Sequence, residues 1–134
     1  MAGYSGTPLP KKLGIVEGAR LALLNAPADF VDTLGSLPSG VTVAQRAGKA
    51  HDVIVVFATE RAALAQAIAK HERAIFPAGA IWAAWPKRAS KVPTDITDDV
   101  VREICLPRGL VDVKVCAIDD TWSGLKLVWR KERR

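Results

Sequence analysis

The sequence predicts an α/β domain with a mostly parallel sheet, helices on both faces and an antiparallel strand pair at the C-terminal end. Two observations lead to this fold class. Apolar runs typical of buried strands alternate along the chain with segments of helical period. The connection between the last two runs is short, so that pair must be antiparallel, because parallel neighbours need a crossover of about a dozen residues.

The predicted strands are continuous apolar runs, as expected where a sheet is covered on both faces. Asp52–Ala58 is the clearest of them, since it is apolar and β-branched almost throughout. We expect strands at Leu21–Leu24, Val41–Ala44, Asp52–Ala58, Ala80–Trp85, Val111–Ile118 and Leu125–Trp129. Too few residues separate Val41–Ala44 from Asp52–Ala58 for a standard crossover. Val41–Ala44 is therefore either a short edge strand with an extended return or an antiparallel strand.

Three helices are expected between these strands. Ala28–Leu37 carries an apolar stripe of helical period and stops at a Pro-Ser-Gly turn. Thr59 is the expected N-cap of a long helix from Glu60 to about Ile75. Thr97 is the expected N-cap of a helix through about Leu106, with acids in its first turn where the helix dipole favours them.

Composition indicates one globular domain. The chain has 134 residues, of which 49% are hydrophobic and 25% are charged. We expect an irregular N-terminal arm (1–12), one α/β domain (13–130) and a basic tail (131–134). The longest apolar run is too short to span a bilayer, and the first residues lack the apolar core of a secretory signal. The sequence thus predicts a cytoplasmic protein with no membrane partner.

The residues that bind metals are sparse. Cys105 and Cys116 are not spaced as metal ligands are, and two cysteines are too few for a disulfide framework. Both have apolar neighbours in the sequence. His51 and His71 are isolated in the sequence. We expect buried, reduced thiols and no metal site.

The formal net charge of +5 owes most to three basic clusters, of which the last is Arg130–Arg134. Such a tail is either a solvated chain end or an attractor of phosphate backbones. Trp129 beside Arg130 is the one aromatic and basic pair at the tail, and this pairing is typical of single-stranded nucleic-acid binders.

The loop after the Ala80–Trp85 strand is the best candidate binding site, because ligands of open α/β sheets bind beyond the carboxyl ends of the strands. It supplies Lys87, Arg88, Ser90, Lys91, Thr94 and Asp95. Cations and hydroxyls suit a phosphate or carboxylate group. Asn25 follows the first strand, and Thr59 and Glu60 follow the Asp52–Ala58 strand, so these residues are expected at the same end. In the alternative interpretation Ser90 and Thr94 only order the loop and the cations are solvated.

Several segments resemble the later part of class I S-adenosylmethionine methyltransferases. These are Asp52–Ala58 with the helix after it, the turn Pro77-Ala78-Gly79 leading into Ala80–Trp85, and the closing strand pair. That family has an Asp-Val-Ile-Val-Val-like strand, a helix ending in a Pro-Gly-Gly-like turn, and a final hairpin. The resemblance covers about residues 19–129 and implies a Rossmann-like fold.

The resemblance fails where the cofactor would bind. The family has a glycine-rich loop after the first strand, whereas 25–29 has no glycine and includes Pro27. The family's second strand ends in an acid that binds the ribose, whereas this strand ends at Gln45-Arg46. The comparison implies loss of ordinary cofactor binding, so we expect no cofactor. Asp29 leaves adenosine binding in another pose open.

A second resemblance covers nearly the whole chain. Its signatures resemble those of a small bacterial family catalogued as a domain of unknown function, and they stand at Gly3–Leu9, Trp85–Ser90, Thr94-Asp95, Val113–Ala117 and Trp122–Leu125. This resemblance implies no activity, substrate or catalytic residue.

Taken together, these patterns predict a non-catalytic protein that binds a small anionic ligand or a protein partner, with a homodimer as one form of partnership. Two alternatives stay open. One is a transferase with an atypical pocket around Asn25, Asp29, Thr59 and Lys87. The other is a nucleic-acid-associated module that uses the basic tail.

Overall fold

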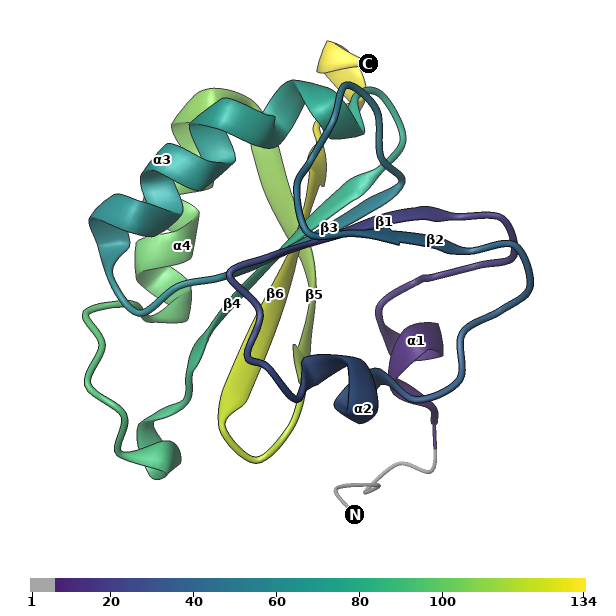
Figure 1. Ribbon diagram of the computed structural model, residues 1–134. Coiled ribbons are helices and arrows are strands. Elements are labelled where there is room, and N and C mark those ends of the chain that lie inside the picture. Colours follow the sequence, from purple (N-terminus) through teal and green to yellow (C-terminus); the bar gives the residue numbers. More distant parts are fainter. Residues whose placement is uncertain (1–6) are drawn as a thin grey trace.

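The computed structural model describes residues 7–134 and assembles the apolar runs into one six-stranded sheet (Figure 1). The strands are β1 (Arg20–Leu24), β2 (Thr42–Ala44), β3 (Val53–Phe57), β4 (Ala80–Pro86), β5 (Leu110–Ala117) and β6 (Trp122–Trp129). The helices are α1 (Leu9–Lys12), α2 (Phe30–Leu34), α3 (Arg61–His71) and α4 (Asp98–Cys105). Single 3-10 turns cover Glu72–Ile75, Arg88–Ser90, Leu106–Arg108 and Lys131–Arg133. The predicted absence of a signal at the first residues and the start of the Gly3–Leu9 signature lie outside the described residues.

The sheet has the order β2-β1-β3-β4-β6-β5, with β2, β1, β3 and β4 parallel and β6 antiparallel to both of its neighbours. This arrangement confirms the predicted fold class. It also decides how residues 41–58 are paired: β2 is a parallel edge strand beside β1, and β3 lies on the other side of β1. The extended chain between Ala44 and Val53 reaches about 26 Å. Because β2 and β3 run in the same direction, the chain between them must run back along the length of a strand, which is ~17 Å for a short strand. The extended chain is long enough to do this without a helix.

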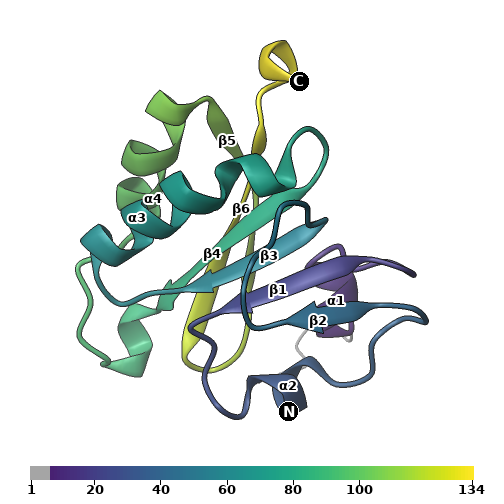
Figure 2. The ribbon, with the colours of Figure 1, turned by 45° about the horizontal axis from the view of Figure 1, so that its top comes forward.

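Two apolar cores lie on the two faces of the sheet, one under α3 and α4 and the other under α1 and α2 (Figure 2). Every residue of β3 and β4 is buried, because these central strands are covered on both faces. Trp82 is fully buried, and its indole N–H donates to the carbonyl of Leu13 at 2.9 Å. Trp85 and Trp129 are also buried.

The start of α3 differs from the prediction, since Thr59 is not its N-cap. The helix begins at Arg61 after Glu60, and neither residue preceding it caps the helix with its side chain. Instead, the Asp95 carboxylate accepts the Arg61 backbone N–H at 2.6 Å from a loop far along the chain. The Thr94 hydroxyl donates to the Thr59 carbonyl at 2.6 Å. The cap of α4 is confirmed, because the Thr97 hydroxyl accepts the Val100 N–H at 3.2 Å.

The other helix boundaries also shift. Helix α2 is shorter than the expected Ala28–Leu37 because it ends at Gly35, which has a φ of 75°. The expected Glu60–Ile75 helix tightens into a 3-10 turn after His71. Leu9–Lys12, expected to be irregular, forms α1. Pro10 lies in the first turn of this helix, where the fixed φ of proline suits a helix. Pro10 and Leu13 are both buried.

The edges of the sheet bear on assembly. Val113 and Val115 of the edge strand β5 are more than half exposed. The register shift between Asp112 and Lys114 is a bulge, and a bulge with a lysine disfavours pairing of an edge with another strand.

None of the helices in residues 7–134 is long and apolar enough to cross a membrane.

Candidate functional site

A hollow of about 420 Å³ lies beyond the carboxyl end of β4, between the loop that leaves this strand and the start of α4. We call it the β4 hollow. Its cationic side chains come from Lys87, Arg88 and Lys91, and its apolar surface includes Trp85 and Ile96. In Figure 1 this loop is the green segment at the lower left that joins β4 to α4. The structure thus brings the strand end and its basic loop together in one concave site.

The three cations of the β4 hollow are available to a ligand. Within residues 7–134 none of them pairs with a carboxylate. Arg88 and Lys91 are exposed and Lys87 is partly buried. Lys91 has a φ of 62°, a left-handed conformation that costs a residue with a side chain ~1–2 kcal/mol. Strained residues of this kind cluster at binding sites.

One acid also lines the hollow, and it is already engaged. The Asp98 carboxylate lies 3.3 Å from the Arg102 guanidinium and accepts the Asp99 backbone N–H at 3.0 Å. The Val100 N–H at the start of α4 is taken by the Thr97 hydroxyl. An anion in the β4 hollow would therefore be held by side-chain cations rather than by the helix N-terminus.

Three of the predicted site residues order the loop instead of facing a ligand with free groups. The Ser90 hydroxyl donates to the Lys87 carbonyl at 2.7 Å and accepts the Val92 N–H at 3.2 Å. Thr94 lines the hollow, but its hydroxyl donates to Thr59 and accepts the Ile96 N–H. Asp95 caps α3. These bonds tie the loop to α3 and hold its backbone in place.

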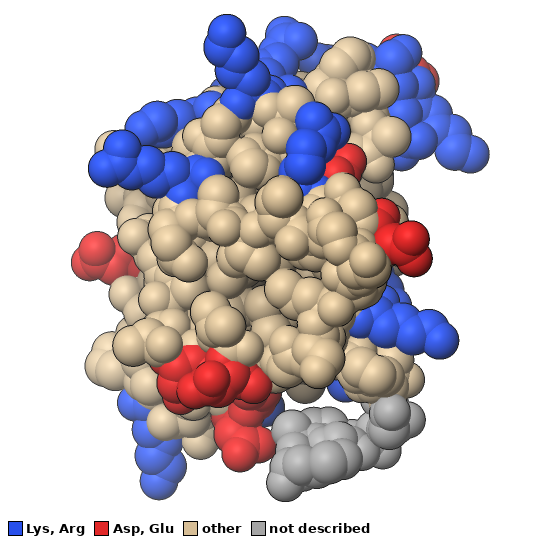
Figure 3. All heavy atoms as spheres, turned by 45° about the vertical axis from the view of Figure 1, so that its right-hand side comes forward, with Lys and Arg blue, Asp and Glu red and all other residues tan. Residues whose placement is uncertain are grey.

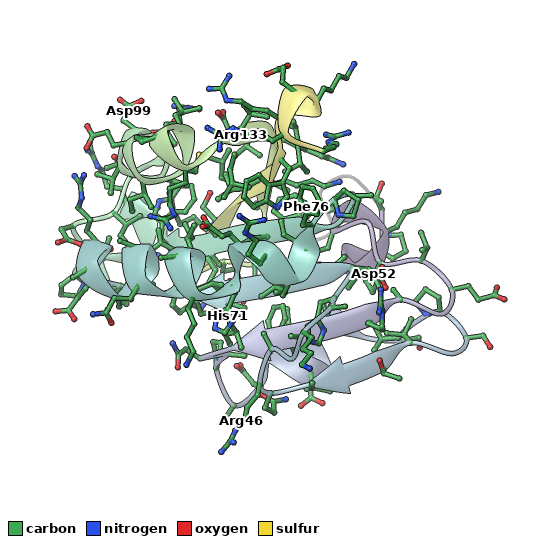
Figure 4. The ribbon with its side chains drawn as sticks, turned by 90° about the horizontal axis from the view of Figure 1, so that it is seen from above. Arg46, Asp52, His71, Phe76, Asp99 and Arg133 are labelled. Atoms are coloured by element: carbon green, nitrogen blue, oxygen red, sulfur yellow. The ribbon has the colours of Figure 1, made fainter. Side chains whose placement is uncertain are left out.

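A second hollow, of about 530 Å³, lies at the carboxyl ends of β1 and β2 against α3. We call it the β1 hollow. Asn25 lines it with a φ of 58°, together with Gln45, Arg46 and His71 among other residues. Figure 4 labels Arg46, which comes from the loop after β2, and His71, which comes from the end of α3. Asn25 is therefore separated from the lysines of the β4 hollow.

The remaining predicted residues line neither hollow. Asp29 precedes α2 without capping it by its side chain, and its carbonyl accepts the Thr33 N–H at 3.1 Å. Thr59 is exposed and joined to Thr94 through its carbonyl. Of the predicted set, Lys87, Arg88, Lys91 and Thr94 meet in the β4 hollow, and Asn25 lies in the β1 hollow.

The structure places His51 and His71 near each other, although they are isolated in the sequence. Burial lowers the pKa of His71, and the nearby charges of Lys70 and His51 lower it further. The His51 ring accepts the Gly48 N–H at 2.7 Å through Nε2, and its buried Nδ1 has no hydrogen-bond partner within the described residues. His51 lies on the loop between β2 and β3, and His71 lies at the end of α3. No sequence motif joins two such positions, so sequence reasoning missed this pair. Among residues 7–134 no group of three or more His, Cys, Asp or Glu side chains could hold a metal ion.

Solved structures resemble this architecture, although no protein-family model matches the chain and no curated protein matches its sequence. A putative type 11 methyltransferase from Sulfolobus solfataricus aligns with a TM-score of 0.63 at 9% identity, covering 92% of this chain and 90% of that one. An S-adenosylmethionine-dependent methyltransferase from Aquifex aeolicus aligns with a TM-score of 0.60 at 13% identity, covering 87% and 85%. A tRNA methyltransferase from B. subtilis aligns with a TM-score of 0.58 at 12% identity, covering 92% and 66%.

The chain has a methyltransferase-like Rossmann fold. These likenesses establish the fold alone, because the sequence identities are so low. The residues at the β1 end do not suit the cofactor that such a fold implies. Within the described residues no carboxylate lines the β1 hollow to bind ribose hydroxyls, and Arg46 follows β2 where an acid is expected. Pro27 has no N–H to offer at the bend after β1.

Proposed function

We propose that the protein binds a small anionic ligand in the β4 hollow and does not transfer methyl groups. The observation that carries this proposal is a set of three cations around one concave site, none of which pairs with a carboxylate in the part of the chain that the structure describes. We also propose that it acts in the cytoplasm. Both cysteines are free, as is usual where thiols are kept reduced.

The site suits a ligand with an anionic head and an apolar body. The Arg88 guanidinium can bind a phosphate or carboxylate through two parallel N–H bonds, whereas Lys87 and Lys91 act as point charges. Trp85 and Ile96 offer an apolar wall beside these cations. Ser123, from β6, adds a polar residue to the lining of the hollow.

A non-catalytic role is supported by the chemistry of the β1 hollow. Asn25, Gln45 and Gln66 line it with amides, and Arg46 and Lys70 line it with cations. Within the described residues this lining supplies no carboxylate that could bind the ribose of the cofactor. The transferase alternative predicts saturable calorimetric binding of S-adenosylmethionine that Asn25→Ala weakens, whereas our proposal predicts a flat titration.

Thermal unfolding in inorganic phosphate tests the anion site. Phosphate at ten times its Kd should stabilise the folded state by ~1.4 kcal/mol, which corresponds to about 5 °C in Tm. Lys87→Ala combined with Lys91→Ala should abolish this shift. The matched control is Lys49→Ala with Lys114→Ala, which removes the same charge from exposed positions outside the hollow and should keep the shift. An unchanged phosphate shift in the first double variant would contradict the proposal.

A further inference from the structure

Six cations gather at the end of the sheet opposite the β4 hollow. This is the end at which β6 finishes and the last residues, 130–134, lie. We call this surface the basic pole. Its cations are Arg73, Arg108, Arg130, Lys131, Arg133 and Arg134. The same segments hold two acids, Glu72 and Glu132, which leaves an excess of four positive charges. Figure 3 shows Lys and Arg side chains crowding the upper end of the molecule, the end at which the C-terminus lies in Figure 1.

Trp129 joins the segments of the basic pole. Its indole N–H donates to the Glu72 carbonyl at 2.9 Å, and the Arg73 guanidinium lies 5.9 Å from its ring. The Trp129 carbonyl accepts a hydrogen bond from the Arg134 side chain at 2.9 Å. This bond holds the last residues against the fold, and Lys131 to Arg134 stay exposed to solvent.

The turn before β5 holds the chain end from the other side. The Arg130 backbone N–H donates to the Gly109 carbonyl at 3.0 Å. The Arg133 guanidinium packs so closely over Gly109 that a Cβ there would lie 3.0 Å from it. Three segments distant in sequence thus build one cationic surface.

Most of this charge is available. Among the described residues of the pole, Arg108 alone is neutralised, by a two-bond ion pair with Glu72 at 2.6 and 2.9 Å. Within the described residues the other five cations pair with no carboxylate. Unpaired cations spread over one surface suit a chain of phosphates better than a single anion.

Phe76 adds an aromatic platform to the cations. Phe76 is 41% exposed, and its ring packs against that of Trp129 with centroids 5.6 Å apart and planes at 82°. Figure 4 labels Phe76 and Arg133 at this end of the molecule. An exposed ring fixed among cations provides the two contacts that single-stranded nucleic acids use, namely base stacking and phosphate attraction.

We propose that the basic pole binds single-stranded nucleic acid through the Phe76 ring and the five cations that pair with no carboxylate in the described residues. The short turns that present these residues lack the long apolar helix face with which proteins lie on membranes. The pole is separate from the β4 hollow, because β6 runs antiparallel to β4 and ends beside its beginning.

Fluorescence anisotropy with a labelled oligouridine, titrated at several salt concentrations, tests this proposal. With about five phosphate contacts, the affinity of the wild-type protein should fall roughly a hundred-fold between about 50 and 200 mM salt. Arg73→Gln with Lys131→Gln should reduce the slope of log affinity against log salt by about 1.4. Lys87→Gln with Lys91→Gln removes the same charge from the β4 hollow and should leave the slope unchanged.

Variants of Phe76 test the stacking contact. Phe76→Leu should weaken binding by roughly ten-fold, and Phe76→Tyr should restore it, because any aromatic ring can stack a base. Phosphate-dependent melting shifts should survive in all of these pole variants, which separates this proposal from that for the β4 hollow. The proposal is overturned if both double variants weaken binding equally or if Phe76→Leu binds as well as wild type. It is also overturned if vesicles of phosphatidylserine and phosphatidylcholine bind the pole while the oligouridine does not.

Discussion

Lys91→Gly separates the contribution of this residue to stability from its contribution to binding. Lys91 holds a left-handed conformation with φ 62° and ψ 9°, at a cost of ~1–2 kcal/mol for a residue with a side chain. Glycine adopts that conformation freely but loses ~0.5–1 kcal/mol more backbone entropy on folding. The net expectation is a gain of about 0.5–1 kcal/mol, or about 2–4 °C in Tm.

The same substitution removes a cation from the β4 hollow, so the stabilisation by phosphate should shrink. Differential scanning fluorimetry with and without phosphate measures both effects. Lys91→Ala is the matched control, because it removes the charge and keeps the strained backbone. It should lose the same part of the phosphate shift without the gain in Tm. The reasoning is refuted if Lys91→Gly melts below Lys91→Ala, or if it keeps the full phosphate shift.

Three further substitutions test the contacts that build the fold around the site. Asp95→Ala should cost about 1 kcal/mol in urea unfolding, because the Arg61 N–H loses its cap, and Asp95→Asn should recover part of it. A wild-type unfolding energy for Asp95→Ala would contradict the cap. Gly79→Ala should cost ~1–3 kcal/mol by the same assay, since its Cβ would lie 2.8 and 2.9 Å from the carbonyl oxygens of His51 and Asp52. An unchanged midpoint would contradict this close approach. The side-chain hydrogen bond from Arg20 lowers the pKa of Asp52 below its usual 3.8. This contribution to stability is present above that value and is lost as pH falls through the folded pKa. Tm measured against pH should therefore fall less steeply below about pH 4 in Asp52→Asn than in wild type, and identical slopes would contradict the assignment.

The central strands could be predicted because strands buried on both faces consist almost entirely of apolar residues. Val53–Phe57 and Ala80–Pro86 are buried on both faces, so nearly every residue is apolar and their identification needs no knowledge of neighbours. The place of β2 could not be predicted in this way. Thr42 and Val43 are exposed, and the direction of this strand depends on the path of the return after Ala44.

Helix capping shows where local rules stop. Thr59 has the right residue type and position to cap α3, but Asp95, from the loop after β4, takes that role. The competing residue lies 34 positions away, a separation that no capping pattern includes. The Thr97 cap could be predicted because donor and acceptor lie three residues apart.

The candidate site could be predicted in part for the same reason. Lys87, Arg88 and Lys91 follow a strand that its apolar composition identifies, so the topology rule for α/β sheets places them at its carboxyl end. The separation of Asn25 from them could not be foreseen, because it depends on the strand order, in which β3 lies between β1 and β4. The basic pole also depends on tertiary contacts, since Arg73, Gly109 and Arg133 meet only in the folded chain.

The anion site is tested most directly by following the backbone amide resonances of the isotopically labelled protein during a titration with inorganic phosphate. We predict saturable shifts at Lys87, Arg88 and Lys91 and at Ser123, all around the β4 hollow. Shifts confined to Asn25 and the other residues of the β1 hollow, or no saturable shift at all, would contradict the account.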